Sequence, residues 1–240
     1  MKGEYSIYAR ASILFLLTFI IASFVVAHSL RKFYGRELRE KCYRNQVTFS
    51  LRVAQNLPDN AIVFVGDSLV RGLCVAAVAP YAVNLGIGRD TTKGVLQRIG
   101  QYNTLQRASA IVLQIGINDL IQGRQSGIID RYTSIIRKLP RNAEIILNAL
   151  LPVDERMTDK VRNSDIRSIN KLLHDSCSMY ANCHFLDCTE RFIDFSGNLQ
   201  SQFHVGDGIH LNSNGYGIWI ENLKTILEFL DVYSAKEQNQ

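Results

Sequence analysis

The chain has 240 residues, of which 47% are hydrophobic and 20% charged, so it can bury a substantial core and does not have the composition of a disordered protein. Its net charge of +5 comes from the N-terminal region, where residues 1–30 carry a net +1 and residues 31–44 a net +4. Because the remaining residues balance at zero, the folded part lacks the basic surface of a nucleic-acid binder, and we expect no nucleic-acid partner.

The first predicted element is a membrane anchor. Residues 11–27 (ASILFLLTFIIASFVVA) contain no charged residue, and a helix of this length, at about 1.5 Å per residue, just crosses a bilayer. We therefore predict an uncleaved transmembrane helix within residues 1–30. Residues 31–47 follow as a basic juxtamembrane stalk, which either lies against anionic lipid head groups or is a solvated charged segment.

The next predicted region is a globular domain over residues 48–234, ahead of a polar tail at 235–240. Within it, short apolar runs rich in β-branched residues alternate with amphipathic stretches, which predicts a three-layer α/β domain with a buried parallel sheet. The predicted strands are residues 61–65, 82–85, 110–115, 144–149 and 183–186, and the predicted helices are residues 92–104, 126–139, 163–180 and 213–233.

Polar segments follow three of these strands, and a fourth stands near the C-terminus. They read GDS (66–68), GIGRDT (86–91), GIND (116–119) and GDGIH (206–210). Sites in open parallel sheets lie outside the carboxyl ends of the strands, so these segments are expected to converge at one edge of the sheet. Each segment alone is more often turn chemistry than a site, whereas the set in this order is specific.

The converging residues are suited to acyl transfer. A serine hydroxyl is a weak nucleophile until a base takes its proton, and His210 is a suitable base for Ser68. Asp207 can hold the imidazole tautomer and stabilise the imidazolium. Other polar residues have structural interpretations: Asp67 and Asp119 are expected to fix loops. His204 is either structural or part of the pocket lining.

The oxyanion of the tetrahedral intermediate needs preorganised donors. The candidates are the backbone N–H of Ser68, a backbone N–H at Gly88 or Arg89, and the side-chain amide of Asn118.

Four sequence blocks carry a family resemblance: VFVGDSLVRG, VNLGIGRDTT, LQIGINDL and DGIHLNSNGY. They resemble the motifs of the SGNH (GDSL) hydrolase superfamily, and the chain looks like a bacterial membrane-anchored esterase or lipase of the GDSL type. The resemblance implies a flavodoxin-like αβα sandwich of about five parallel strands. It also implies a Ser68–Asp207–His210 triad, the three oxyanion donors, and no metal or organic cofactor.

One position departs from this pattern. Many relatives have glycine directly before the aspartate of the second block, where this chain has Arg89. A backbone N–H serves whatever the side chain is, unless the position needs a positive φ, which only glycine adopts comfortably. The donor is therefore the N–H of Arg89 or, after a loop shift, that of Gly88. The Arg89 side chain either reaches an anionic substrate or points to solvent.

The expected activity is hydrolysis of a carboxylic ester through an acyl-serine intermediate. The substrate would be a small molecule, a lipid acyl ester or an O-acetyl group on carbohydrate, and the lack of a long apolar insertion favours short acyl groups. The alternatives are an O-acyltransferase acting on envelope polysaccharide and a catalytically silent, anchored binding module. The intact blocks argue against the silent module.

The sequence gives conflicting signals on the location of the catalytic domain. The positive-inside rule would place the catalytic domain in the cytosol, whereas the resemblance to exported hydrolases and the cysteine count favour the periplasmic or outer side, which we predict.

Of the five cysteines, Cys177, Cys183 and Cys188 lie close together in the sequence. Either two of these form a disulfide or they are buried thiols, and the odd count favours thiols.

Overall fold

The computed structural model describes the fold of residues 2–232 and the side chains of residues 18–232. The chain forms two compact units, residues 1–45 and residues 46–240, and each is described by itself. The first unit is helical and belongs to α1 (Lys2–Ala54), where Glu40 pairs with Arg36 and Arg44 one turn away on either side. The predicted limits of stalk and domain stay predictions, and the predicted tail, 235–240, lies outside the described residues.

The predicted membrane anchor is wrong. Among the described residues, no helix combines the length and the apolar character needed to cross a membrane. The described side chains of α1 begin at Thr18, and the basic residues of 31–44 follow the apolar run in the same helix. Residues 11–17 of the run lie among those whose side chains are not described. The predicted placement of the catalytic domain on the periplasmic or outer side of a membrane depended on this anchor and is therefore wrong as well.

The second unit is built on a five-stranded parallel sheet in the spatial order β2-β1-β3-β4-β5, which confirms the predicted sheet. Every strand begins and ends within one residue of its predicted limits. The strands are β1 (Ile62–Gly66), β2 (Ala82–Asn84), β3 (Ala110–Gln114), β4 (Glu144–Asn148) and β5 (Cys183–Leu186).

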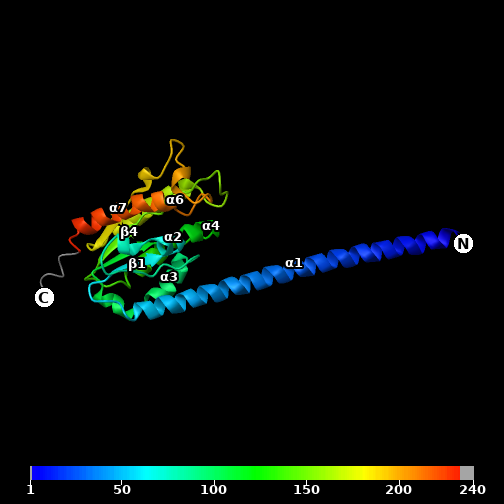
Figure 1. The fold of residues 1–240 in the computed structure, drawn as a ribbon, viewed down its shortest axis with the longest axis horizontal. Coiled ribbons are helices and arrows are strands. Elements are labelled where there is room, and N and C mark those ends of the chain that lie inside the picture. Colours follow the sequence, from blue (N-terminus) through cyan, green and yellow to red (C-terminus); the bar gives the residue numbers. More distant parts are fainter. Residues whose placement is uncertain (1, 233–240) are drawn as a thin grey trace. The chain divides into compact units, whose positions relative to one another are not determined.

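Alternate residues of each central strand face two separate cores. In β1, Val63 and Val65 belong to one core and Ile62 and Phe64 to the other, because successive side chains of a strand point to opposite faces. The sheet is therefore the middle of three layers, with helices on both faces (Figure 1). The first core contains residues of α3 (Thr92–Ile99), α5 (Ile128–Ile136) and α6 (Asn163–Cys177), and the second contains residues of α2 (Ser68–Gly72) and α7 (Ser213–Phe229).

The helices are shorter than predicted, and two were missed. α3 ends at Ile99, before Gly100, and the chain continues into a separate 3₁₀ turn. The missed helices, α2 and α4 (Ile117–Ile121), are single turns that directly follow β1 and β3. The 3₁₀ turns are η1 (Val75–Ala77), η2 (Asn103–Arg107), η3 (Thr189–Arg191) and η4 (Ser201–Phe203).

A disulfide joins Cys177, at the end of α6, to Cys183, at the start of β5. The favoured interpretation of these two cysteines as thiols was therefore wrong. Cys188 is a buried thiol, and burial raises its pKa to about 12, so it is neutral at physiological pH.

Candidate active site

Ser68 is the first residue of α2 and lies two residues after the end of β1, with Asp67 between them. The turn that carries it is fixed by Asp67, whose side chain accepts a hydrogen bond from the backbone N–H of Leu69 at 3.0 Å. Gly66 permits close approach of the neighbouring strand, since a Cβ there would lie 2.1 Å from the carbonyl oxygen of Gln114. The strand, the glycine and the cap together present Ser68 at the carboxyl edge of the sheet.

The structure brings Ser68, His210 and Asp207 together in one hydrogen-bonded chain. Ser68 Oγ lies 2.9 Å from His210 Nε2, and His210 Nδ1 lies 2.6 Å from Asp207 Oδ2. The other carboxylate oxygen of Asp207 accepts the backbone N–H groups of Ile209 and His210 at 3.0 and 2.9 Å. Partial burial opposes ionisation of Asp207, but the hydrogen bonds from His210 and Ile209 outweigh it and lower the pKa of the carboxyl. Asp207 is therefore an anion at neutral pH.

The loop after β2 has an unusual backbone at Arg89. This residue has a φ of 67°, the left-handed region that side chains other than glycine avoid. The N–H of Gly88 is already engaged, because it donates to Oε1 of Gln46 at 3.1 Å. Among the hydrogen bonds of the residues that the structure describes, none uses the N–H of Arg89. Of the two candidate backbone donors, Arg89 is thus the one that is unoccupied.

Asn118 lies in α4, directly after β3, and faces the same loop. Its Nδ2 donates to the carbonyl oxygen of Asp90 at 3.0 Å. An amide nitrogen carries two hydrogens, so this bond fixes the side chain and leaves a second donor.

A buried aspartate is adjacent in sequence to each of Ser68, Arg89 and Asn118. Asp90 is paired with Arg98 at 2.8 Å, and Asp119 with Arg131 at 3.3 Å. Among the residues that the structure describes, Asp67 has no such partner. Burial is the main cause that raises the pKa of its carboxyl to about 7; the Leu69 N–H opposes the shift, and the charges of Asp90 and Asp119 add to it. Asp67 and Asp119 thus fix loops, as their positions in the sequence suggest.

Residues 64–218 match the GDSL-like Lipase/Acylhydrolase family. The chain belongs to this family. It is 29% identical over 165 residues to the platelet-activating factor acetylhydrolase IB subunit alpha1 of Rattus norvegicus, which covers 65% of this chain and 69% of the relative. It is 30% identical over 178 residues to the alpha2 subunit of Homo sapiens, covering 70% and 75%.

The fold is that of the GDSL (SGNH) hydrolases, as the sequence blocks imply. The crystal structure of the lipase/acylhydrolase from Enterococcus faecalis superposes with a TM-score of 0.61 at 18% identity, covering 70% of this chain and 95% of that one.

One feature of this GDSL-like acylhydrolase was missed from its sequence. Gln46 was assigned to the stalk, yet it lies in the second unit and binds both Gly88 and the guanidinium of Arg71. The only available signal was its helical spacing from Ser50, which lies one turn further along. Of the two interpretations of His204, the structure favours the structural one, because the residue is 7% exposed and bonds to the loop that carries Asp207.

Proposed function

We propose that the protein is a serine esterase that hydrolyses a carboxylic ester through an acyl-serine intermediate. The observation that carries the proposal is the continuous hydrogen-bonded chain from Ser68 through His210 to Asp207, with distances of 2.9 and 2.6 Å. Ser68 and His210 are 142 residues apart in sequence, and nucleophile, base and orienting group stand in the order that nucleophilic catalysis requires.

In the first half-reaction, Ser68 Oγ attacks the ester carbonyl carbon while its proton passes to His210 Nε2. The carbonyl π-electrons move to oxygen and form the oxyanion of a tetrahedral intermediate. Asp207, an anion at neutral pH, stabilises the imidazolium. When the intermediate collapses, the carbon–oxygen bond to the alcohol breaks, and the leaving alkoxide takes the proton from His210.

In the second half-reaction, water attacks the acyl-serine, His210 accepts its proton, and the acid is released with return of the proton to Ser68. Water can reach this position, since the side chains of His210 and Asp207 are 44% and 45% exposed.

The oxyanion would be held by three donors: the N–H of Ser68, the N–H of Arg89 and the free hydrogen of Asn118. The N–H of Ser68 is at the first position of α2, where backbone donors have no partner within the helix. Arg89 is favoured over Gly88 because Gln46 occupies the N–H of Gly88.

The substrate class proposed is an ester of a short acyl group, on a lipid or on a carbohydrate. The relatives that match most of the domain are named acetylhydrolases, which supports a small acyl group. A panel of p-nitrophenyl esters tests this point: a preference for long acyl chains over acetyl would contradict it. Analysis of the products with a polysaccharide acceptor present would reveal acyl transfer.

The decisive test is labelling of the full chain with a fluorophosphonate probe, beside its Ser68→Ala variant. The probe reports an activated serine without knowledge of the substrate. We expect rapid labelling of the wild type and none of the variant. A correctly folded wild type that fails to label would refute the esterase and support the silent binding module.

A further inference from the structure

The loop that carries Asp207 and His210 is closed at its base by a bridge between His204 and Leu211. The N–H of Val205 also donates to the carbonyl oxygen of His210, at 2.9 Å. Residues 205–210 therefore form a short loop that projects from this base. The positions of Asp207 and His210 depend on the conformation of this loop.

Two glycines make this loop intrinsically adaptable. Gly206 and Gly208 flank Asp207 and have φ values of 98° and 76°, a region in which glycine is comfortable and other residues are strained. Because glycine also loses the most conformational freedom on ordering, a loop of this kind needs specific contacts to hold one geometry.

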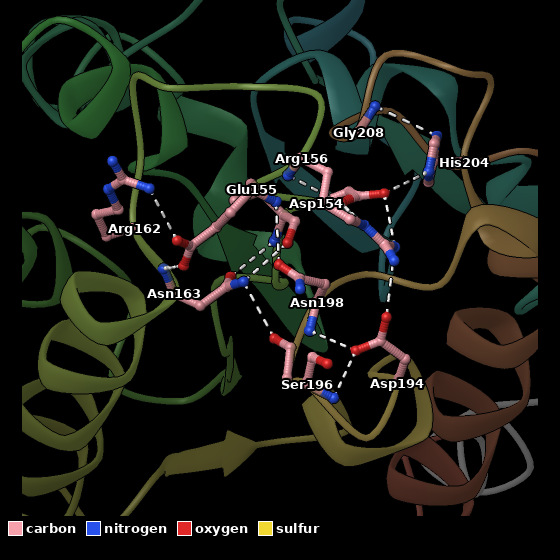
Figure 2. Close-up of polar contacts among 12 residues, drawn as sticks. Asp154, Glu155, Arg156, Arg162, Asn163, Asp194, Ser196, Asn198, His204 and Gly208 are labelled. Atoms are coloured by element: carbon pink, nitrogen blue, oxygen red, sulfur yellow. Dashed lines mark hydrogen bonds and ion pairs between the residues drawn. The ribbon is translucent and has the colours of Figure 1, made fainter.

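One atom supplies these contacts to both glycines. His204 Nδ1 accepts the backbone N–H of Gly206 at 3.0 Å and that of Gly208 at 3.2 Å. An imidazole nitrogen accepts only when it carries no hydrogen, so the hydrogen of the neutral ring is on Nε2. Figure 2 shows the ring of His204 between Gly208 and Asp154.

The far side of the ring faces an anion. His204 Nε2 lies 3.5 Å from Asp154 Oδ2, and both side chains are 4% exposed. The backbone of Asp154 also binds the loop, since its N–H donates to the carbonyl oxygen of Gly208 at 2.8 Å. Asp154 is in turn held by Arg156 at 2.7 Å, which also pairs with Asp194 at 3.3 Å (Figure 2).

We propose that His204 is a positioning residue of the hydrolase. Its Nδ1 fixes Gly206 and Gly208, and through them Asp207 and His210, while Asp154 favours the tautomer with the hydrogen on Nε2. The inference rests on the proposed function, because it assigns His204 a part in holding that same triad. His204 itself does not touch the reacting atoms.

Two amide variants separate this role from mere filling of space. In His204→Asn the side-chain oxygen falls near the position of Nδ1 and can accept the glycine N–H groups. In His204→Gln the oxygen falls near the position of Nε2, so the glycines lose their acceptor although the side chain is larger. His204→Ala removes both features. The matched control is His184→Ala, which removes another histidine–carboxylate pair, 2.7 Å from Glu144, on β5 and β4.

The measurements are kcat and KM on p-nitrophenyl acetate, the fluorophosphonate labelling rate, and the low-field NMR resonance of the hydrogen between His210 and Asp207. We expect His204→Gln and His204→Ala to lower kcat about 100-fold with little change in KM, since misplacement of a reacting group by about 1 Å has an effect of this size. They should also lose the NMR resonance, whereas His204→Asn should keep it and recover most of kcat.

If His204→Ala does not fold, the comparison of His204→Asn with His204→Gln tests the inference instead. Equal kcat in the Asn and Gln variants would overturn the inference, as would a folded His204→Ala with wild-type kcat. These outcomes presuppose an active wild type that loses labelling in Ser68→Ala. A wild type without labelling would instead be a failure of the proposed esterase, so the two failures are distinguishable.

Discussion

The side-chain oxygen of Gln46 accepts the backbone N–H of Gly88 at 3.1 Å. The same oxygen accepts a hydrogen bond from Arg71 at 2.8 Å. Because Arg71 lies in α2, three residues after Ser68, this one atom ties the nucleophile's helix to the loop that carries the proposed oxyanion donor.

Replacing Gln46 with alanine should therefore loosen the loop and weaken catalysis. One neutral hydrogen bond contributes about 1 kcal/mol net, so we expect kcat/KM to fall about fivefold to tenfold with a small change in melting temperature. The measurement is kcat/KM on p-nitrophenyl acetate. Gln55→Ala, an exposed glutamine just beyond the end of α1, is the control and should have no effect. Wild-type kcat/KM in Gln46→Ala would show that the contact is incidental.

Arg89→Gly should stabilise the protein and leave the reaction intact. A left-handed φ at a residue other than glycine costs about 1–3 kcal/mol, of which the greater entropy of glycine in the unfolded chain offsets part. A net gain of about 1 kcal/mol corresponds to a rise in melting temperature of about 2–4 °C for a protein of this size. Arg89→Ala keeps the strained backbone and should show no such rise. If both variants melt alike, the backbone strain at this position is not significant.

Asn118→Ala removes a proposed oxyanion donor and should act on the chemical step. Loss of one such donor typically lowers kcat about 100-fold to 1000-fold, and KM should change little. Steady-state kinetics on a short-chain ester measure this split. Asn182→Ala is a fitting comparison, because that amide also donates to a backbone carbonyl, that of Ala143 at 2.8 Å, just ahead of β5. A KM effect in Asn118→Ala without a kcat effect would assign Asn118 to substrate binding.

Asp67 should make the folded protein less stable as the pH rises. Burial raises the pKa of its carboxyl from 3.8 to about 7. Between these values the unfolded chain has released the proton and the folded protein retains it, so the free energy of unfolding decreases with rising pH. The contribution is fully present below pH 3.8 and is lost as the pH passes through about 7.

Asp67→Asn should abolish this dependence while keeping an acceptor for the Leu69 N–H. The variant should match the wild type in stability near pH 4 and exceed it near pH 8 by roughly 4 kcal/mol at most, at about 1.4 kcal/mol per unit of pKa. Chemical unfolding at a series of pH values measures the difference. A constant difference between the two proteins across the range would show that Asp67 keeps an ordinary pKa in the fold.

The parts of the fold that were predictable are those with a local signature. Short β-branched runs mark buried strands, and Gly-Asp-Ser after the first of them marks a turn that exposes a side chain. The parallel topology then requires Ser68, Asn118 and the loop at Arg89 to lie at the same edge of the sheet.

The parts that were not predictable depend on contacts between distant segments. Gln46 and Gly88 are 42 residues apart in sequence, and no local pattern links a helical glutamine to a loop N–H. Arg98 is 1% exposed although helical patterning would place a charged residue outside, because Asp90 neutralises it inside. The membrane anchor was the opposite error: it was predicted from a local apolar run alone, and none of the described helices is long and apolar enough to cross a membrane.

The last turns of α1 add a constraint on chain length. Gln46 binds Gly88, Ser50 bonds to Tyr102, and the carbonyl oxygen of Ala54 accepts from Thr104, so residues at four-residue intervals on one face of the helix contact two segments, the loop after β2 and the turn at 102–104. Each residue advances a helix by roughly 100°. A single residue inserted between Gln46 and Ser50 would turn Gln46 away from Gly88, whereas substitutions on the outer face would leave it in place. Homologous chains that use this contact should therefore vary in composition over this segment and not in its length.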